Sequence, residues 1–150
     1  MISISAQGRL SKYVQQSGGM DPLVWDGRTD KIGIVLKTTP PEPGRDPERE
    51  SLTYKLELIR LGQTSSFRID RELLGNFYQV DTGKRQEPFK FLERFGPRGR
   101  VFDVHDKALT APEESFPEDE TLLSVTAGPF TQNEHIPPFR SQLATWRVYH

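Results

Sequence analysis

The sequence contains no cysteine, so neither a disulfide framework nor a thiolate metal site is available to this chain. No apolar run approaches the roughly 18 residues that a membrane-spanning helix needs. Neither sign of charge is in excess, since 20 Lys and Arg residues meet 21 Asp and Glu residues, and this balance gives no general attraction to nucleic acid. The first residues lack the basic start and apolar stretch of a signal peptide, so we expect a cytoplasmic protein.

Sequence motifs for nucleotide and metal chemistry are also missing. The chain has no GxxxxGK[ST] phosphate loop, no GxGxxG loop, no HExxH pair, no GxSxG elbow and no EF-hand loop. Without a phosphate loop, no segment is expected to wrap a triphosphate with its backbone N–H groups. We therefore expect neither catalysis nor a cofactor for this chain by itself.

The residues that are present predict a single domain with a modest core. A chain of 150 residues with 34% hydrophobic residues is long enough to bury one core. Apolar residues recur every four positions over residues 1–17, which predicts a helix that ends at Gly18 and Gly19. Short runs of alternating apolar and polar residues between 31 and 106 predict an antiparallel sheet. Its expected strands include 31–38, 51–60, 66–70 and 89–95, and we expect a break at Gly75 and Asn76.

Two proline-rich and charged segments separate these elements. Residues 39–50 predict a mobile loop, and residues 107–138 predict a loose connection with one or two helical turns. Residues 139–150 follow a proline pair and predict a closing helix. The order favours an α+β fold over residues 1–150, in which an N-terminal and a C-terminal helix pack on an antiparallel β meander of about five to six strands.

Both ends of the sequence are apolar. The chain enters a helical pattern without a capping residue, and its last five residues, from Trp146 to His150, include the aromatic Trp146 and Tyr149. Such ends are typical of a partial domain cut from something larger. We therefore expect self-association through exposed apolar surface.

One short segment is a candidate for metal binding or acid–base chemistry. Asp103, His105 and Asp106 supply the side chains that ligate divalent metals, which would suit a small metal-dependent hydrolase. Adjacent strand residues point to opposite faces, however, so a polar strand end is the simpler interpretation. A further acidic set could offer oxygen ligands to calcium, although its spacing is more typical of a solvated loop. This set is Glu113, Glu114, Glu118, Asp119 and Glu120.

Arginine and tryptophan residues give two further candidate sites. Arg94, Arg98 and Arg100 surround one predicted hairpin and could neutralise or stack on nucleic acid, although arginines at such positions are also common on ordinary surfaces. Trp25 and Trp146 are predicted core anchors, because a buried indole removes much apolar area from water. Trp25 also lies in a predicted loop, where it could make a contact instead.

Three groups of residues carry a resemblance to a known family. Gly18 and Gly19, followed by Trp25-Asp26-Gly27, resemble the GG…WxG loop of RecF/SMC-like AAA ATPases, which are ABC-type P-loop proteins. The runs 52–58 and 67–73 are similar to a strand pair of that family. The closing segment 139–150, with Trp146 and Tyr149, resembles the family's next helix.

The resemblance implies that the chain is the middle of an ATPase head, namely its antiparallel subdomain and following helix, without Walker A and Walker B. The family's nucleotide-binding residues have no matching positions here. An intact relative would bind ATP between two heads and couple hydrolysis to work on DNA or a partner. For this chain the implied role is scaffolding or contact with the remainder of a head, with nucleic acid bound only by the intact protein. The alternative is an independent protein-binding β module.

Overall fold

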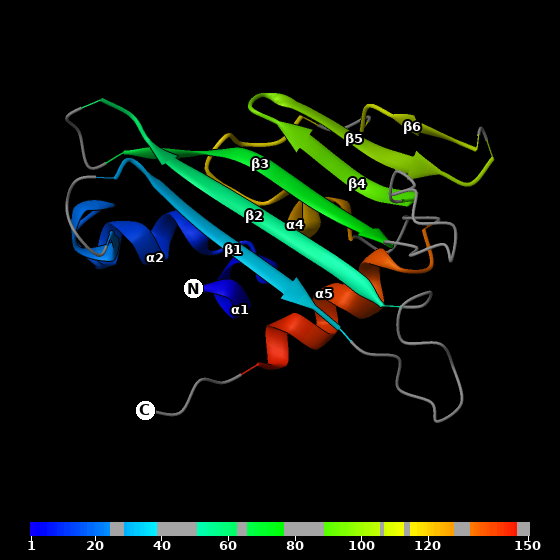
Figure 1. Cartoon of the computed structure of the whole chain (residues 1–150), viewed down its shortest axis with the longest axis horizontal. Helices are drawn as coiled ribbons and strands as arrows, with labels where there is room; N and C mark the ends of the chain where they lie inside the picture. Colours follow the sequence, from blue (N-terminus) through cyan, green and yellow to red (C-terminus); the bar gives the residue numbers. More distant parts are fainter. Residues whose placement is uncertain are drawn as a thin grey trace, which may run out of the picture.

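The structure, a computed structural model, consists of one antiparallel sheet with helices on one side of it (Figure 1). It describes residues 1–24, 29–38, 51–62, 66–76, 89–105, 107–112, 115–127 and 133–146. The six strands follow one another across the sheet in chain order. They are β1 (Lys31–Lys37), β2 (Leu52–Arg60), β3 (Phe67–Asn76), β4 (Phe89–Phe95), β5 (Arg98–Asp103) and β6 (Ala108–Thr110). The predicted α+β meander is thus confirmed.

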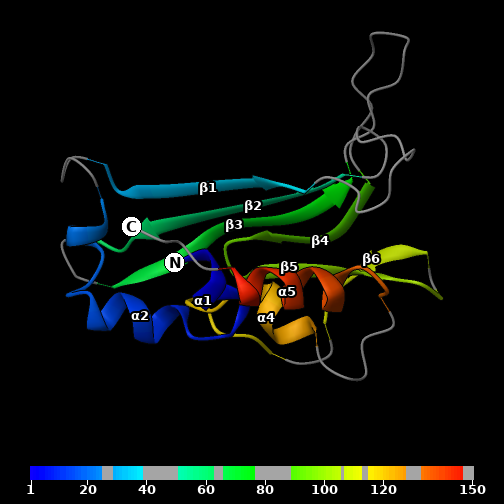
Figure 2. The same ribbon diagram turned by 90° about the horizontal axis from the view of Figure 1, so that it is seen from below.

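Helices from both ends of the chain cover the same face of the sheet (Figure 2). They are α1 (Ile2–Ala6), α2 (Leu10–Gln16), the short 3-10 helix η1 (Asp21–Leu23), α4 (Leu122–Thr126) and α5 (Ile136–Thr145). The first and last helices are joined directly, since Arg140 Nε donates to the carbonyl of Ala6 at 2.9 Å and Ser3 Oγ donates to that of Ala144 at 2.9 Å. No helix among the described residues is long and apolar enough to cross a membrane.

The predicted helix over residues 1–17 is wrong in one respect, because the structure divides it into α1 and α2. Gly8 adopts a φ of +66° between them, a conformation that ends a helix and that glycine adopts readily. The periodicity hides this break because apolar residues are buried on both sides of it. The predicted end of α2 is confirmed: Gly18 and Gly19 have φ of +88° and +95°, and the Gly19 N–H donates to Val14 O at 2.9 Å.

The sheet departs from its predicted strands in two places. We expected a break at Gly75 and Asn76, but both residues lie within β3, which is one strand with register shifts against β2 and β4. β6 was not predicted, and it pairs with β5 inside the segment that we expected to be loose. The predicted mobile loop, residues 39–50, lies outside the described residues.

Apolar side chains from the strands and the helices fill the space between the two layers. Tyr54 and Phe139 illustrate the contact, with ring centroids 5.6 Å apart across the interface of β2 and α5. Burial of each large side chain contributes about 1.5–3 kcal/mol. The fully buried apolar residues include Leu10, Met20, Tyr54, Leu56, Leu58, Ile69, Leu74, Leu92, Leu122, Leu123, Ile136 and Leu143.

Candidate functional site

A buried carboxylate lies at the centre of the interface between the sheet and α4. Glu72 is only 1% exposed, on the core-facing side of β3. Its Oε1 accepts hydrogen bonds from Tyr54 Oη at 2.8 Å and from the Leu123 N–H at 2.9 Å, and its Oε2 accepts one from the Leu122 N–H at 2.6 Å. All these donors belong to the fold itself, so Glu72 anchors the first turn of α4 to the sheet.

Burial shifts the titration of this group and its neighbours. Loss of solvent raises the pKa of Glu72, although its backbone and Tyr54 hydrogen bonds act in the opposite direction. The pKa of Tyr54 is raised well above its usual range, first by burial and then by the charge of Glu72. Strongly shifted groups often mark catalytic sites, but here burial in the core is the largest cause of both shifts, and both groups are hydrogen-bonded within the fold.

Arg94 is buried as well, at 1% exposed. The prediction that it contacts nucleic acid is therefore wrong. Its Nε donates to Gly96 O at 2.8 Å, and its two terminal nitrogens donate to Glu120 O at 2.8 Å and Pro117 O at 3.1 Å. The guanidinium carbon also lies 5.0 Å from the centre of the Phe116 ring. Burial lowers the pKa of Arg94, which stays protonated and fastens the segment before α4 to the sheet.

The acidic segment before α4, residues 118–120, also forms hydrogen bonds with the start of α2. Glu120 Oε2 accepts from the Leu10 N–H at 3.1 Å, and its Oε1 accepts from the Ser11 N–H at 3.0 Å. Ser11 Oγ donates to Asp119 Oδ2 at 2.6 Å. The Glu120 carboxylate thus caps the first amides of α2, and Asp119 binds the Ser11 hydroxyl beside them. The described part of the chain has no group of three metal-ligating residues. Glu113 and Glu114 lie outside the described residues.

This arrangement also revises the prediction for residues 107–138. Besides β6, the Ile69 N–H donates to Glu118 O at 2.8 Å, and Thr121 Oγ1 donates to Ser5 O at 2.8 Å. The described segment from 117 to 123 is therefore packed between the sheet and α1. Charge and proline content predicted a loose connection because they do not reveal which backbone groups the sheet will bind.

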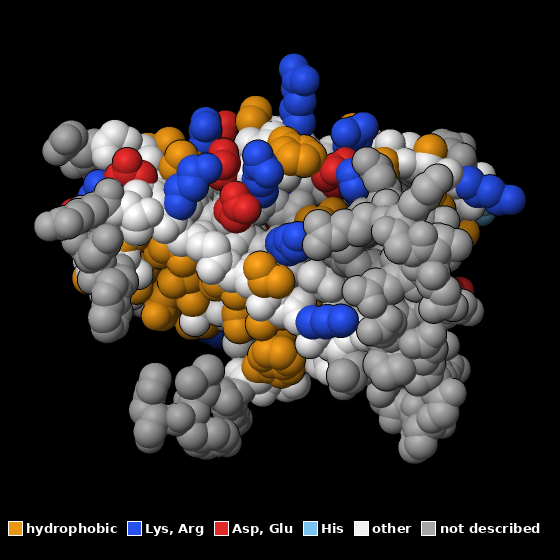
Figure 3. Space-filling model, in the orientation of Figure 1, with side chains coloured by type: hydrophobic (Ala, Val, Ile, Leu, Met, Phe, Trp, Pro, Cys, Tyr) orange, Lys and Arg blue, Asp and Glu red, His pale blue; other side chains and the backbone are white. Residues whose placement is uncertain are grey.

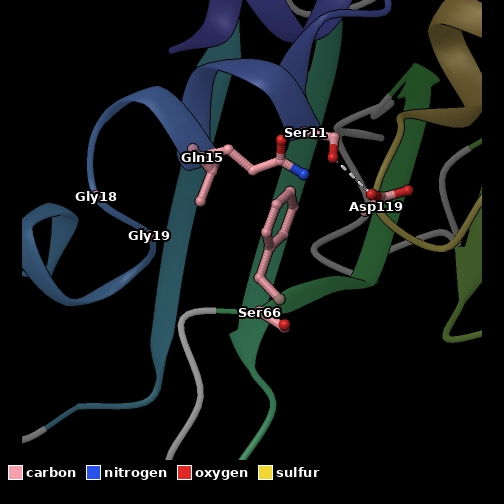
Figure 4. A pocket seen from close by; sticks show the side chains of 8 residues that line it. Ser11, Gln15, Gly18, Gly19, Ser66 and Asp119 are labelled. Atoms are coloured by element: carbon pink, nitrogen blue, oxygen red, sulfur yellow. Dashed lines mark hydrogen bonds between the residues drawn. The ribbon is translucent and has the colours of Figure 1, made fainter.

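A polar groove of about 340 Å³ lies beside the glycine pair that ends α2 (Figure 4). In Figure 4 the Gln15 side chain extends from α2 across the opening toward Ser11 and Asp119, which are joined by their hydrogen bond. Its lining residues are Ser11, Val14, Gln15, Gly18, Gly19, Ser66, Phe67 and Asp119. They include a carboxylate and no cationic side chain, so the groove does not suit a triphosphate.

The other two arginine candidates lie at a groove of about 590 Å³ along the start of β5. Arg98 and Arg100 line it together with Phe95, which is 50% exposed. Arg100 is also paired with Glu93, whose Oε2 lies 3.3 Å from its guanidinium nitrogen. These two arginines therefore stay a predicted nucleic-acid contact, without Arg94.

The candidate metal residues lie at the last residue of β5 and directly after it, and they are brought together only in part. The carboxylate of Asp103 accepts a hydrogen bond from the backbone N–H of His105 at 2.7 Å, and His105 is exposed. This contact is a local turn rather than a ligand arrangement. Asp106 lies outside the described residues.

The tryptophan and tyrosine positions of the family resemblance are only partly described. Trp146 follows the last residue of α5 and is 39% exposed, so the prediction of a core anchor is wrong for it. The helical stripe ends with Phe139 and Leu143, which are buried, because α5 stops at Thr145. Trp25, Gly27 and Tyr149 lie outside the described residues.

The second face of the sheet carries charged side chains and no described helix (Figures 2 and 3). Lys and Arg residues alternate with Asp and Glu residues over its strands in Figure 3. Glu93 binds Lys90 at 2.6 Å, Arg71 lies 3.9 Å from Glu57, and Arg71 also lies 5.5 Å from the centre of the Phe95 ring. The large exposed apolar side chains are spread over several elements, namely Val35, Leu61, Phe89, Phe95, Val104 and Trp146.

Comparisons of the chain with protein-family models, with curated proteins and with solved structures give no match. The functional argument therefore depends on the fold and on the residues described above. Sequence reasoning missed Glu72 and did not predict that Arg94 is buried. The alternation gave no signal for either residue, because charged side chains occupy other positions of the same parity and the register shift opposite Glu57 and Leu58 changes which side of β3 faces the core.

Proposed function

We propose that this chain is a non-catalytic, antiparallel portion of an ATPase head of the RecF/SMC-like kind, with a scaffolding or contact role and no ATP hydrolysis by itself. One observation carries the proposal: the described parts of the motif-bearing segments follow α2, form the β2–β3 pair and include α5, and these three elements pack around one core. Gly18 and Gly19, the glycines of the first motif, end α2.

The polar groups of the core support a scaffolding role. Glu72 and Arg94 both form hydrogen bonds with backbone groups of the fold. The groove at the glycine pair has no cationic side chain that would attract phosphate. Antiparallel sheets commonly leave one face to solvent, and the charged face of this sheet is accessible for contacts in the same way.

Melting temperature measured with and without MgATP tests the absence of a nucleotide site. We expect no shift in the melting temperature, because the groove at the glycine pair has no cation to bind phosphate. A nucleotide that did bind the folded state alone would, at about 100 times its Kd, add about 2.7 kcal/mol to the free energy of unfolding. MgCl2 alone and a non-nucleotide polyphosphate serve as controls for ionic effects. A saturable stabilisation specific to ATP would contradict the proposal.

The proposed place in an ATPase head has a separate test in the coding sequence on either side of this chain. We expect a GxxxxGK[ST] segment upstream and a Walker B segment downstream in the same reading frame. Reading frames on both sides that code for neither would contradict this part of the proposal.

An independent protein-binding β module is the second candidate function. The observation in its favour is that the uncovered face and one long sheet edge are accessible within the described part of the chain. Such a module would bind its partner with the same affinity whether or not the rest of an ATPase head is present.

A further inference from the structure

The outer edge of β1 is an unpaired strand edge within the described part of the chain. β1 pairs with β2 on one side and stands at the end of the sheet order, so no described strand occupies its other side (Figure 1). It has seven residues, contains no proline and keeps one unbroken register with β2. Long regular edges of this kind are templates for the addition of another strand.

The ladder with β2 shows which backbone groups of β1 point outward. The Arg60 N–H donates to Asp30 O at 2.8 Å, and the Thr38 N–H donates to Leu52 O at 2.9 Å. Hydrogen-bonded pairs alternate along an antiparallel ladder, so the even-numbered residues between them also bond to β2. The N–H and C=O groups of Lys31, Gly33, Val35 and Lys37 therefore point to the free edge.

The opposite edge of the sheet provides a contrast. β6 has only three residues, and a strand of that length offers few backbone groups to a partner. Lys107, directly before it, has a φ of +51°, which bends the chain away from an extended course. The two edges thus differ in kind, and only β1 presents a straight row of backbone donors and acceptors.

Side chains on β1 indicate the chemistry of a strand that would fit beside it. Ile32, Ile34 and Leu36 face the helix side and are only half-buried, so apolar side chains beside them would extend the core. Lys31 and Lys37 occupy the two ends of the other face and both are exposed, and Lys31 Nζ also lies 3.1 Å from Asp70 Oδ2 of β3. An added strand would therefore carry apolar residues at every second position and a carboxylate opposite each lysine.

In the register that pairs all seven residues of β1, a second copy of this chain fits less well than such a strand. An antiparallel pair of β1 strands centred on Ile34 would place Lys31 of each copy opposite Lys37 of the other. Like charges directly opposite one another destabilise a strand pair. Charge complementarity therefore favours a different, acidic-ended segment as the occupant of the edge.

We propose that the outer edge of β1 binds an extended partner segment by strand addition, with alternate apolar residues on the helix side and acidic residues facing Lys31 and Lys37. The inference rests on the proposed contact role and names the place and chemistry of that contact. The partner strand would run antiparallel to β1, like every other neighbouring pair in the sheet.

Binding of a labelled peptide to the full chain tests this proposal. The probe is Glu-Val-Thr-Val-Thr-Val-Glu with blocked ends, followed by fluorescence anisotropy. Its threonine N–H groups would point to Gly33 and Val35, so N-methylation of both threonines is expected to weaken binding by about ten-fold or more. N-methylation of the first and last valines, whose N–H groups point away, is the matched control and is expected to change affinity by less than about three-fold.

Substitutions in β1 itself test the same proposal with the peptide unchanged. Val35→Pro removes an outward N–H and leaves the ladder to β2 intact, so we expect the peptide to lose at least about ten-fold in affinity. Val35→Thr, which keeps the N–H, is expected to bind as the unchanged chain does. If Val35→Pro does not fold, Lys37→Glu offers a second route, because it is expected to shift the preference to a peptide with lysine at its first position, opposite residue 37, and glutamate still at its last, opposite Lys31.

Three results would overturn the proposal. They are no binding of the probe at about 1 mM, equal binding of the two N-methylated peptides, and a dimer in sedimentation that Val35→Pro converts to a monomer. The last would assign the edge to a second copy. The peptide assay contains no nucleotide, so a stabilisation by ATP would contradict the proposed function alone, and a silent peptide would contradict only strand addition.

Discussion

The two faces of the sheet use the same residue types for different purposes. On the covered face, Glu72 and Arg94 are each about 1% exposed and bind backbone groups of the segment around α4. On the uncovered face, Glu57 and Arg71 form a pair at 3.9 Å with side chains that are 40% and 60% exposed. The buried groups position the helix layer, whereas the exposed pair contributes little, because solvent screens it. Burial rather than residue type therefore separates the charges that hold the fold from those available for contacts.

The largest expected difference between the two faces is in the free energy of unfolding that one glutamate substitution on each face removes. Glu72→Leu leaves Tyr54 Oη and two α4 amides without an acceptor, so we expect a loss of about 3–5 kcal/mol in the free energy of unfolding. Glu57→Leu on the uncovered face is expected to change it by less than about 0.5 kcal/mol. Urea unfolding followed by circular dichroism measures both, and similar losses would remove the distinction.

The pH dependence of stability sharpens this prediction. Because burial raises the pKa of Glu72, the folded chain holds that proton more tightly than the unfolded chain does. The stability from this proton is fully present below the unfolded pKa and is lost as the pH rises through the folded pKa. The difference in unfolding free energy between the unchanged chain and Glu72→Gln is therefore expected to shrink as the pH rises through that window, and a difference that grows would contradict the raised pKa.

Two glycines give a second matched comparison. A Cβ at Gly99, on the covered side of β5, would lie 2.5 Å from Phe116 Cζ and 3.0 Å from Leu122 Cδ2. Gly99→Ala is therefore expected to cost about 1–3 kcal/mol through overpacking. Gly33→Ala on β1 meets no atom within 4 Å, and we expect it to be neutral within about 0.5 kcal/mol. Equal effects in thermal unfolding would show that the covered face can relax around the added methyl group.

The capping role of the acidic segment predicts a smaller effect. Glu120→Ala removes both acceptors from the first amides of α2, so we expect a loss of about 1 kcal/mol. Glu134→Ala, at an exposed position before α5, is the control and is expected to be neutral. A calcium-dependent rise in melting temperature that Glu120→Ala abolishes would instead support a metal site and contradict the cap.

The smallest expected effect concerns the uncovered face. Lys31 Nζ lies 3.1 Å from Asp70 Oδ2, with Lys31 more than half exposed. Asp70→Asn is expected to change the unfolding free energy by about 0–1 kcal/mol, and added salt should reduce that change further. Unfolding in low and high salt checks this, and a loss above about 2 kcal/mol would mean that this pair holds the sheet together.

Alternation of apolar and polar residues was sufficient to predict most strands. It located β1, β2 and β4 within one residue of their ends, because one side of each strand packs against helices. It failed at β3, where a register shift lets Gly75 stay inside the strand. It also failed at β6, which is too short to show a pattern and exists because β5 offers it a partner.

The candidate site was less predictable than the fold. Sequence could show that phosphate and metal motifs are missing, and it could place the glycine pair at the end of α2. It could not show that Arg94 turns inward while Arg98 and Arg100 stay exposed, since all three belong to one hairpin. Nor could it show that Glu120 reaches α2, a contact between residues about 110 positions apart. Such contacts depend on the assembled layers.

Amide hydrogen exchange along β1, followed by NMR on a dilute sample, tests most directly whether the outer edge of β1 is free to bind a partner strand. The account predicts fast exchange at Gly33 and Val35, whose N–H groups point to the free edge, and slow exchange at Ile32, Ile34 and Leu36, which bond to β2. Equal protection at odd and even positions of a monomeric chain would show that the edge is already occupied, and would contradict the account.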